Sequence, residues 1–294
     1  MSRNETKERV FVTCNWGENA TQLMEGYRKQ TPNNDCVWGC FELVDKLEEA
    51  SCVLVLDGTS VNIPDDKRVI FFGREPAHVT SPNIPAIKRA EVYHHHMGNS
   101  WCASTWWLGI DYASLKSLSV DDVEKTRSLS VIESGKTFLP GHQKRLRLVR
   151  KLASEYPLEI DIYGHVTKNA SGHSYKTELP KKSKEKGLLP YRYALSIENG
   201  SSKNYFTEKF VDPILCWSMP IYWGCKEIER FFPSGSFVWI DIDDPHATEK
   251  IIEIANSNYR EENIPRLAEA RELILDKYNL FPTVEKVLKG EELI

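Results

Sequence analysis

Five polar side chains that could bind a charged or hydroxyl-rich ligand fall within one short stretch of the sequence. Glu198 and Asn199 come first, and Tyr205, Glu208 and Lys209 follow a few residues later. Carboxylates and amides bind hydroxyl groups, and a lysine near a helix N-terminus binds anions together with the backbone N–H groups there. A lone acid or lysine on a helix usually faces water, but this concentration of polar groups favours a ligand site.

The elements around this stretch predict how the five groups are brought together. Residues 193–197 form a short apolar run with β-forming residues, which fits a buried strand, and the turn residues 198–202 end it. Asn204 is the predicted N-cap of the following helix, and residues 221–223 form the next strand. The helix should direct three side chains inward: Phe210, Ile214 and Trp217. A strand–loop–helix–strand unit of this length is a parallel crossover, in which ligands bind at the carboxyl ends of the strands.

The same stretch resembles the sugar-nucleotide motif of the family-10 glycosyltransferases, the α-1,3/1,4-fucosyltransferases. The matching segments read IENG at residues 197–200, YFTEK at 205–209 and MPIYWG at 219–224, with Gly200 where that family usually has serine. The resemblance covers most of residues 65–245. It implies two Rossmann-like α/β domains that face a cleft, the glycosyltransferase B fold, in a soluble protein of microbial or viral type.

The resemblance also implies an activity, which is inverting transfer of fucose from GDP-fucose to a hydroxyl of a glycan acceptor. The diphosphate that leaves must be stabilised, and the acceptor hydroxyl must lose a proton. Arg145, near the start of a predicted helix, matches an arginine that contacts the phosphates in the family, and Lys209 is the second candidate. Glu198, Asn199, Tyr205 and Glu208 would complete the donor site.

Glu75 is the candidate general base. It follows the predicted strand 69–72 and the turn at Gly73, and its neighbour Arg74 would favour the ionised carboxylate. Family members carry a glutamate in a similar short segment, although here the sequence Glu-Pro-Ala makes the alignment short. The alternative is a surface ion pair between Glu75 and Arg74 without a catalytic role.

The length and composition place the protein among soluble globular chains. It has 294 residues, of which 41% are hydrophobic and 27% charged, and its net charge of -4 gives no general attraction to nucleic acid or to anionic membranes. The sequence contains no run of about 18 apolar residues, so it predicts no membrane span. The N-terminus lacks the apolar core of a signal peptide. Asn199 begins an Asn-x-Ser triplet whose glycosylation would block the site. We therefore expect a cytoplasmic protein.

Alternating strands and helices predict a mixed α/β chain with two domains. We place the boundary in the polar segment 121–127, which gives an acceptor-side domain at 1–122 and a sugar-nucleotide domain with C-terminal helices at 123–294. Within the first domain, residues 41–50 are predicted to form a helix.

The seven cysteines show no disulfide or zinc spacing, and adjacent histidines at 94–96 would point to alternate faces of a strand. No Asp-x-Asp pattern lies where metal-dependent glycosyltransferases place one, so we expect no metal requirement. Three tryptophans suit either a wall for sugar stacking or ordinary packing: Trp101, Trp106 and Trp107.

Two alternatives to GDP-fucose transfer remain open at this point. One keeps the fold and the mechanism but changes the donor, for example to UDP-xylose. The other is a non-catalytic carbohydrate-binding protein, which the joint presence of Glu75, Arg145 and Lys209 disfavours. The acceptor, the linkage and the oligomeric state are not specified by the sequence.

Overall fold

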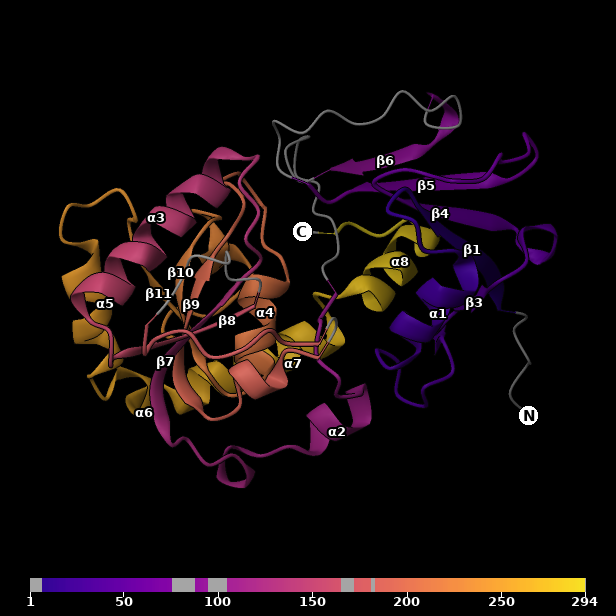
Figure 1. The fold of residues 1–294 in the computed structure, drawn as a ribbon. Coiled ribbons are helices and arrows are strands. Elements are labelled where there is room, and N and C mark those ends of the chain that lie inside the picture. The colour runs from indigo at the N-terminus through magenta and orange to yellow at the C-terminus, as the bar shows by residue number, and fades with distance from the viewer. Residues whose placement is uncertain (1–6, 76–87, 95–104, 165–171, 181–182, 294) are drawn as a thin grey trace. The chain divides into compact units, whose positions relative to one another are not determined.

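The computed structural model describes residues 7–75, 88–94, 105–164, 172–180 and 183–293, which form two compact α/β units (Figure 1). Unit 1 comprises residues 1–105, 111–114 and 276–294, and unit 2 comprises residues 106–110 and 115–275. The second unit thus begins before the predicted boundary at 122, and the last helix belongs to the first unit rather than to the second.

Unit 1 is built on a six-stranded sheet with the order β2-β3-β1-β4-β5-β6. Its strands are β1 (Glu8–Cys14), β2 (Val37–Trp38), β3 (Phe41–Val44), β4 (Cys52–Leu56), β5 (Arg68–Gly73) and β6 (Glu91–His94). All neighbours pair in parallel except β2, which runs antiparallel to β3. Strand β4 is apolar throughout, and β1 and β5 carry apolar runs at residues 10–12 and 69–72, because both faces of a parallel sheet are covered.

The prediction of a helix over residues 41–50 was wrong. Residues Phe41–Val44 form strand β3, and only Leu47–Glu49 coil into a short 3-10 turn. Phe41, Leu43 and Val44 are buried, and β3 pairs in parallel with β1. Pairing with a neighbouring strand therefore decided the structure of a segment whose local sequence fits a helix as well.

The chain returns to unit 1 at its C-terminal end. Helix α8 (Leu280–Lys289) packs on β2 and β3, where the ring of Phe281 stacks on Phe41 with centroids 5.8 Å apart. Trp38 donates from Nε1 to Glu285 Oε2 at 3.1 Å. These contacts explain why α8 belongs to unit 1. The remaining helix of this unit is α1 (Ala20–Arg28), and α2 (Tyr112–Ser117) begins in unit 1 and ends in unit 2.

Unit 2 contains a fully parallel sheet with the order β11-β10-β9-β7-β8. Its strands are β7 (Arg127–Glu133), β8 (Ile160–Gly164), β9 (Tyr191–Ile197), β10 (Met219–Trp223) and β11 (Val238–Trp239). Its helices are α3 (Pro140–Glu155), α4 (Glu208–Leu215), α5 (Ala247–Ala255), α6 (Tyr259–Glu262) and α7 (Ile264–Asp276). Helices α3 and α5 pack on one core of the sheet, and α4 contacts β9 and β10.

The predicted crossover from β9 through α4 to β10 is confirmed, with β9 and β10 paired in parallel. Its helix begins later than predicted, because Thr207 and not Asn204 is the N-cap. The side chain of Thr207 accepts a bond from Lys209 N, whereas Asn204 adopts a left-handed φ of 56° in the loop before it. Phe210 and Ile214 lie in the buried face of α4 as expected, while Trp217 lies beyond its end.

Candidate functional site

Glu198 fixes the loop that connects β9 to α4. Its side chain is fully buried, and its two carboxylate oxygens accept bonds from the backbone N and the Oγ1 of Thr207, both at 2.7 Å. Burial raises the pKa of Glu198 to about 7, against the opposing charge of Lys209. Glu198 thus sets where α4 begins, so the structure gives this predicted donor residue a structural role in the loop.

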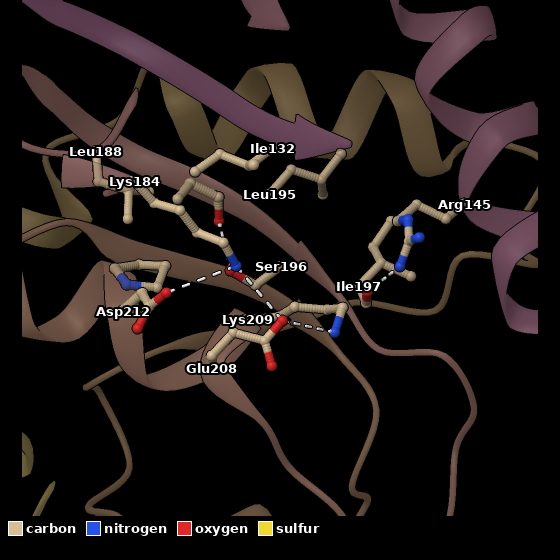
Figure 2. A pocket seen from close by; sticks show the side chains of 12 residues that line it. Ile132, Arg145, Lys184, Leu188, Leu195, Ser196, Ile197, Glu208, Lys209 and Asp212 are labelled. Atoms are coloured by element: carbon tan, nitrogen blue, oxygen red, sulfur yellow. Dashed lines mark hydrogen bonds and ion pairs between the residues drawn. The ribbon is translucent and has the colours of Figure 1, made fainter. Parts of the chain in front are cut away.

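Two lysines and three carboxylates meet at the start of α4, and Figure 2 shows four of them: Lys184, Lys209, Glu208 and Asp212. Lys209 Nζ lies 3.0 Å from Glu208 Oε1 and 3.8 Å from Glu198 Oε2. Lys184 Nζ lies 3.4 Å from Glu208 Oε1 and 3.7 Å from Asp212 Oδ2. Burial alone would raise the pKa of Glu208, but the charges of Lys209 and Lys184 outweigh it and hold the pKa below its ordinary value.

Arg145 projects from α3 into the other side of the same pocket (Figure 2). Its guanidinium pairs with Glu133 through Nε to Oε2 at 2.8 Å and Nη2 to Oε1 at 3.1 Å. Nη1 donates to Ile197 O at 3.1 Å and to Asn199 Oδ1 at 3.3 Å, and Nη2 donates to Ser134 Oγ at 3.3 Å. These bonds occupy all five N–H donors of the arginine. A ligand must therefore displace one of them, and the two 3.3 Å bonds are the weakest.

The start of α3 lies close to the loop that follows β9. A Cβ atom on Gly141 would stand 2.1 Å from the carbonyl oxygen of Asn199, so only glycine allows this approach. His142 is buried beside it, and its Nδ1 accepts a bond from Leu139 N at 3.2 Å. Burial, aided by the charge of Arg145, lowers the pKa of His142 to about 4, so the imidazole is neutral at pH 7.

The remaining predicted donor residues differ in how accessible they are. Asn199 is half-buried and reaches Arg145. Tyr205 is only 3% exposed, and its backbone oxygen accepts a bond from Tyr222 Oη at 3.4 Å. The structure thus brings Arg145, Asn199, Glu208 and Lys209 together in one region, and it buries Tyr205 in the packing of the loop.

Glu75 lies in unit 1 and is exposed, two residues after the end of β5. Its neighbour Arg74 binds Asp57, with Nε and Nη2 at 3.1 and 3.0 Å from Oδ2, and the charge of Glu75 also acts on Arg74. The arginine expected to act on Glu75 is therefore shared with a second carboxylate. The role of Glu75 as a base stays a prediction.

Three residues of this region were missed by the sequence analysis: Glu133, Lys184 and Asp212. Glu133 ends β7, and Asp212 Oδ1 accepts a bond from Trp107 N at 2.9 Å. Lys184 stands 5.0 Å above the ring of Trp107. Glu133 could have been found from the sequence, because it ends a parallel strand and ligands bind at such ends. Lys184 is one of several lysines in a loop, and nothing in the sequence distinguishes it from the others.

The other predictions concern metals, sugar stacking and membranes. Among the residues that the structure describes, no group of three or more His, Cys, Asp or Glu side chains could hold a metal ion. His94 is buried against Gly73, and Trp106 is buried, whereas Trp101 and the other two histidines lie outside the described residues. Nor does any helix in the described ranges combine the length and apolar character needed to cross a bilayer.

Residues 125–261 match the family model described as glycosyltransferase family 10 (fucosyltransferase), C-terminal part. Over these residues the chain is similar to the fucosyltransferases of that family. Among curated relatives, a fucosyltransferase-like protein of Arabidopsis thaliana is 34% identical over 84 residues, which cover 28% of this chain and 15% of the relative. The human 4-galactosyl-N-acetylglucosaminide 3-alpha-L-fucosyltransferase 9 is 26% identical over 106 residues, or 34% of this chain and 30% of the relative.

The chain thus spans less than a third of the length of these curated relatives. Its fold, in contrast, is matched along nearly the whole chain. A crystal structure of an α1,3-fucosyltransferase with GDP-fucose aligns with a TM-score of 0.52 at 16% identity, covering 96% of this chain and 94% of that one. The predicted fold class, with two Rossmann-like domains of the glycosyltransferase B type, is confirmed.

Proposed function

We propose that the protein is an inverting glycosyltransferase that moves fucose from GDP-fucose to a hydroxyl of a glycan. The observation that carries this proposal is the pair Glu208–Lys209 at the start of α4, beside the buried Arg145, within the segment that matches the family. The match of residues 125–261 to the fucosyltransferase family supports GDP-fucose over UDP-xylose, and an α1,3-fucosyltransferase of similar fold has been crystallised with GDP-fucose. The net charge of -4 supports a glycan rather than a nucleic acid as acceptor.

The diphosphate of the donor binds between Lys209 and the start of α3. Lys209 supplies a partly exposed ammonium group, and the helix N-terminus adds the partial positive charge of its backbone N–H groups. Arg145 contributes its fixed charge and exchanges its long bonds to Ser134 and Asn199 for phosphate oxygens. Glu208 accepts hydrogen bonds from hydroxyl groups of the donor, because its lowered pKa keeps the carboxylate ionised at pH 7.

The transfer is a single displacement at the anomeric carbon. The acceptor oxygen forms a bond to that carbon while the bond to the diphosphate oxygen breaks, and the proton of the acceptor hydroxyl passes to the carboxylate of Glu75. The negative charge that develops on the diphosphate is stabilised by Lys209 and Arg145. Removal of the acceptor proton by a positioned carboxylate contributes about a hundred- to ten-thousandfold to the rate.

A donor panel tests this function. GDP-fucose, UDP-xylose and UDP-glucose are each incubated with the protein, and thermal shift and nucleotide release are measured with and without 4-galactosyl-N-acetylglucosaminide, the acceptor named for one relative. We expect GDP-fucose alone to raise Tm and to release its nucleotide faster with acceptor. A thermal shift with a glycan but with none of the donors would replace the proposal by a non-catalytic carbohydrate-binding protein.

The role of Glu75 is tested by Glu75→Gln, which keeps the size of the side chain but removes its basicity. The variant should lose at least about a hundredfold in turnover with an unchanged KM for GDP-fucose. Arg28→Gln serves as the control, because Arg28 lies in the same unit but in the last turn of α1 and not in the segment that follows β5. Near-normal turnover of a folded Glu75→Gln protein would place the base elsewhere.

A further inference from the structure

Trp16 is an exposed aromatic side chain just beyond the carboxyl end of β1, an inner strand of the unit 1 sheet. It lies in the turn after β1, and 40% of its surface is exposed. Among the described residues, exposed large hydrophobic side chains are few and separate in sequence: Trp16, Phe138, Leu158 and Trp239. An exposed tryptophan leaves a large apolar surface in water, which is unfavourable. A ligand that covers the ring removes this surface from water, so the ring is a candidate binding surface.

The ring of Trp16 is held in place from two sides. Its Nε1 donates to Glu18 Oε2 at 2.7 Å, and the guanidinium carbon of Arg74 lies 4.8 Å from the ring centroid. Arg74 is itself fixed by its two bonds to Asp57 Oδ2 and by a backbone N bond to Asp57 Oδ1 at 2.5 Å. The turn after β1 is fixed as well, because Asn15 Nδ2 donates to Asp57 O. Such a ring binds a partner without first losing side-chain entropy.

The groups around the ring indicate the chemistry of its partner. A protein partner would need a contiguous apolar patch, but Asn15, Gly17 and Glu18, which flank Trp16 along the chain, add no apolar side chain to it. Glu18 at the indole edge and Asp57, which pairs with Arg74, place carboxylate oxygens beside the ring, and such oxygens accept hydrogen bonds from hydroxyl groups. A neutral pyranose combines an apolar C–H face with a rim of hydroxyls, which is what a ring bordered by carboxylates can bind.

We propose that Trp16 is the platform on which a neutral sugar ring of the acceptor stacks. The chain places this platform beside the candidate base, because Glu75 directly follows Arg74, the residue that lies over the ring. In this arrangement the sugar packs on the indole, and Glu18 at the indole edge accepts a bond from a sugar hydroxyl. This inference rests on the proposed function in that it makes the bound glycan the acceptor of the transfer.

The test compares Trp16→Ala, Trp16→Phe and Trp239→Ala. Trp239 is the matched control because it is 39% exposed and lies on an edge strand of unit 2. The KM for 4-galactosyl-N-acetylglucosaminide, the KM for GDP-fucose and the hydrolysis of GDP-fucose without acceptor are measured for each. We expect Trp16→Ala to raise the acceptor KM about tenfold or more, and Trp16→Phe by no more than about threefold.

Donor KM and acceptor-free hydrolysis should not change in any of the three variants. An unchanged acceptor KM in a folded Trp16→Ala protein overturns the platform, and an equal rise in both KM values overturns it too, since that would report a general disturbance. If the wild type transfers no sugar, the proposed function fails separately. Saturation-transfer NMR with the same disaccharide then decides: binding lost in Trp16→Ala supports the platform, and no binding by the wild type rejects it.

Discussion

Replacing Glu133 by glutamine should destabilise unit 2, because it leaves the guanidinium of Arg145 buried without its counter-charge. Both side chains are at most 4% exposed, and two bonds of 2.8 and 3.1 Å join them. Glutamine keeps the shape and one acceptor oxygen, but its amide nitrogen faces an N–H donor of Arg145. The substitution therefore removes both a charge and a hydrogen bond from a buried site.

The size of the effect follows from the burial of the pair. Breaking a buried ion pair by removing one partner costs about 3–5 kcal/mol. The oxygen that glutamine retains places Glu133→Gln near the lower end, at about 3 kcal/mol. For a domain of about 150–250 residues, this corresponds to a fall in Tm of roughly 6–12 °C. Asp243→Asn, which removes an exposed partner of Lys144, should cost about 0–1 kcal/mol and serves as the matched control.

The assay is thermal unfolding with and without GDP. A double variant, Glu133→Leu with Arg145→Met, should recover most of the lost stability because two apolar side chains of similar volume replace the pair. That variant should nonetheless lose most of the stabilisation by GDP, since Arg145 no longer supplies its charge. A decrease in Tm smaller than about 2 °C for Glu133→Gln would refute the reasoning, as would stabilisation of the double variant by GDP to the same extent as the wild type.

Three further predictions concern the donor site. Lys209→Ala should weaken GDP binding about tenfold or more in isothermal titration, and unchanged affinity would remove Lys209 from the phosphate site. Turnover should survive EDTA, and a complete loss restored by a divalent ion would contradict this. Folding raises the pKa of Glu198 from 4.5 to about 7. The protonated side chain therefore stabilises the folded protein fully below pH 4.5, and this contribution is lost as the pH rises through 7. The Tm of Glu198→Gln minus that of the wild type should therefore increase between pH 5 and pH 8 in thermal scans, and a flat difference would show that Glu198 does not titrate there.

The sequence predicted the parallel strands well because their apolar runs are continuous and end in turn residues. Strands β5 and β9 were placed to within about two residues at each end, an ordinary margin for element boundaries. The helix predicted for residues 41–50 failed because that segment fits either structure by its local pattern. Its pairing with β1, a contact distant in sequence, made it the strand β3.

The candidate site was predicted in its position but not in its internal contacts. Lys209 and Glu208 meet as expected from their motif. The pairing of Arg145 with Glu133 could not be read from the sequence, because it depends on how α3 packs on the carboxyl end of β7. The N-cap was misassigned because both Asn204 and Thr207 are good capping residues, and the buried Glu198 selects Thr207.

The most direct test of the account is the structure of the reaction product. GDP-fucose and 4-galactosyl-N-acetylglucosaminide are incubated with the wild type and with Glu75→Gln, and the product is analysed by proton NMR at its anomeric signals. The account predicts a fucosylated product whose anomeric configuration is opposite to that of the donor, formed at least about a hundredfold more slowly by Glu75→Gln. A product with the configuration of the donor, or no product with any nucleotide sugar, would contradict it.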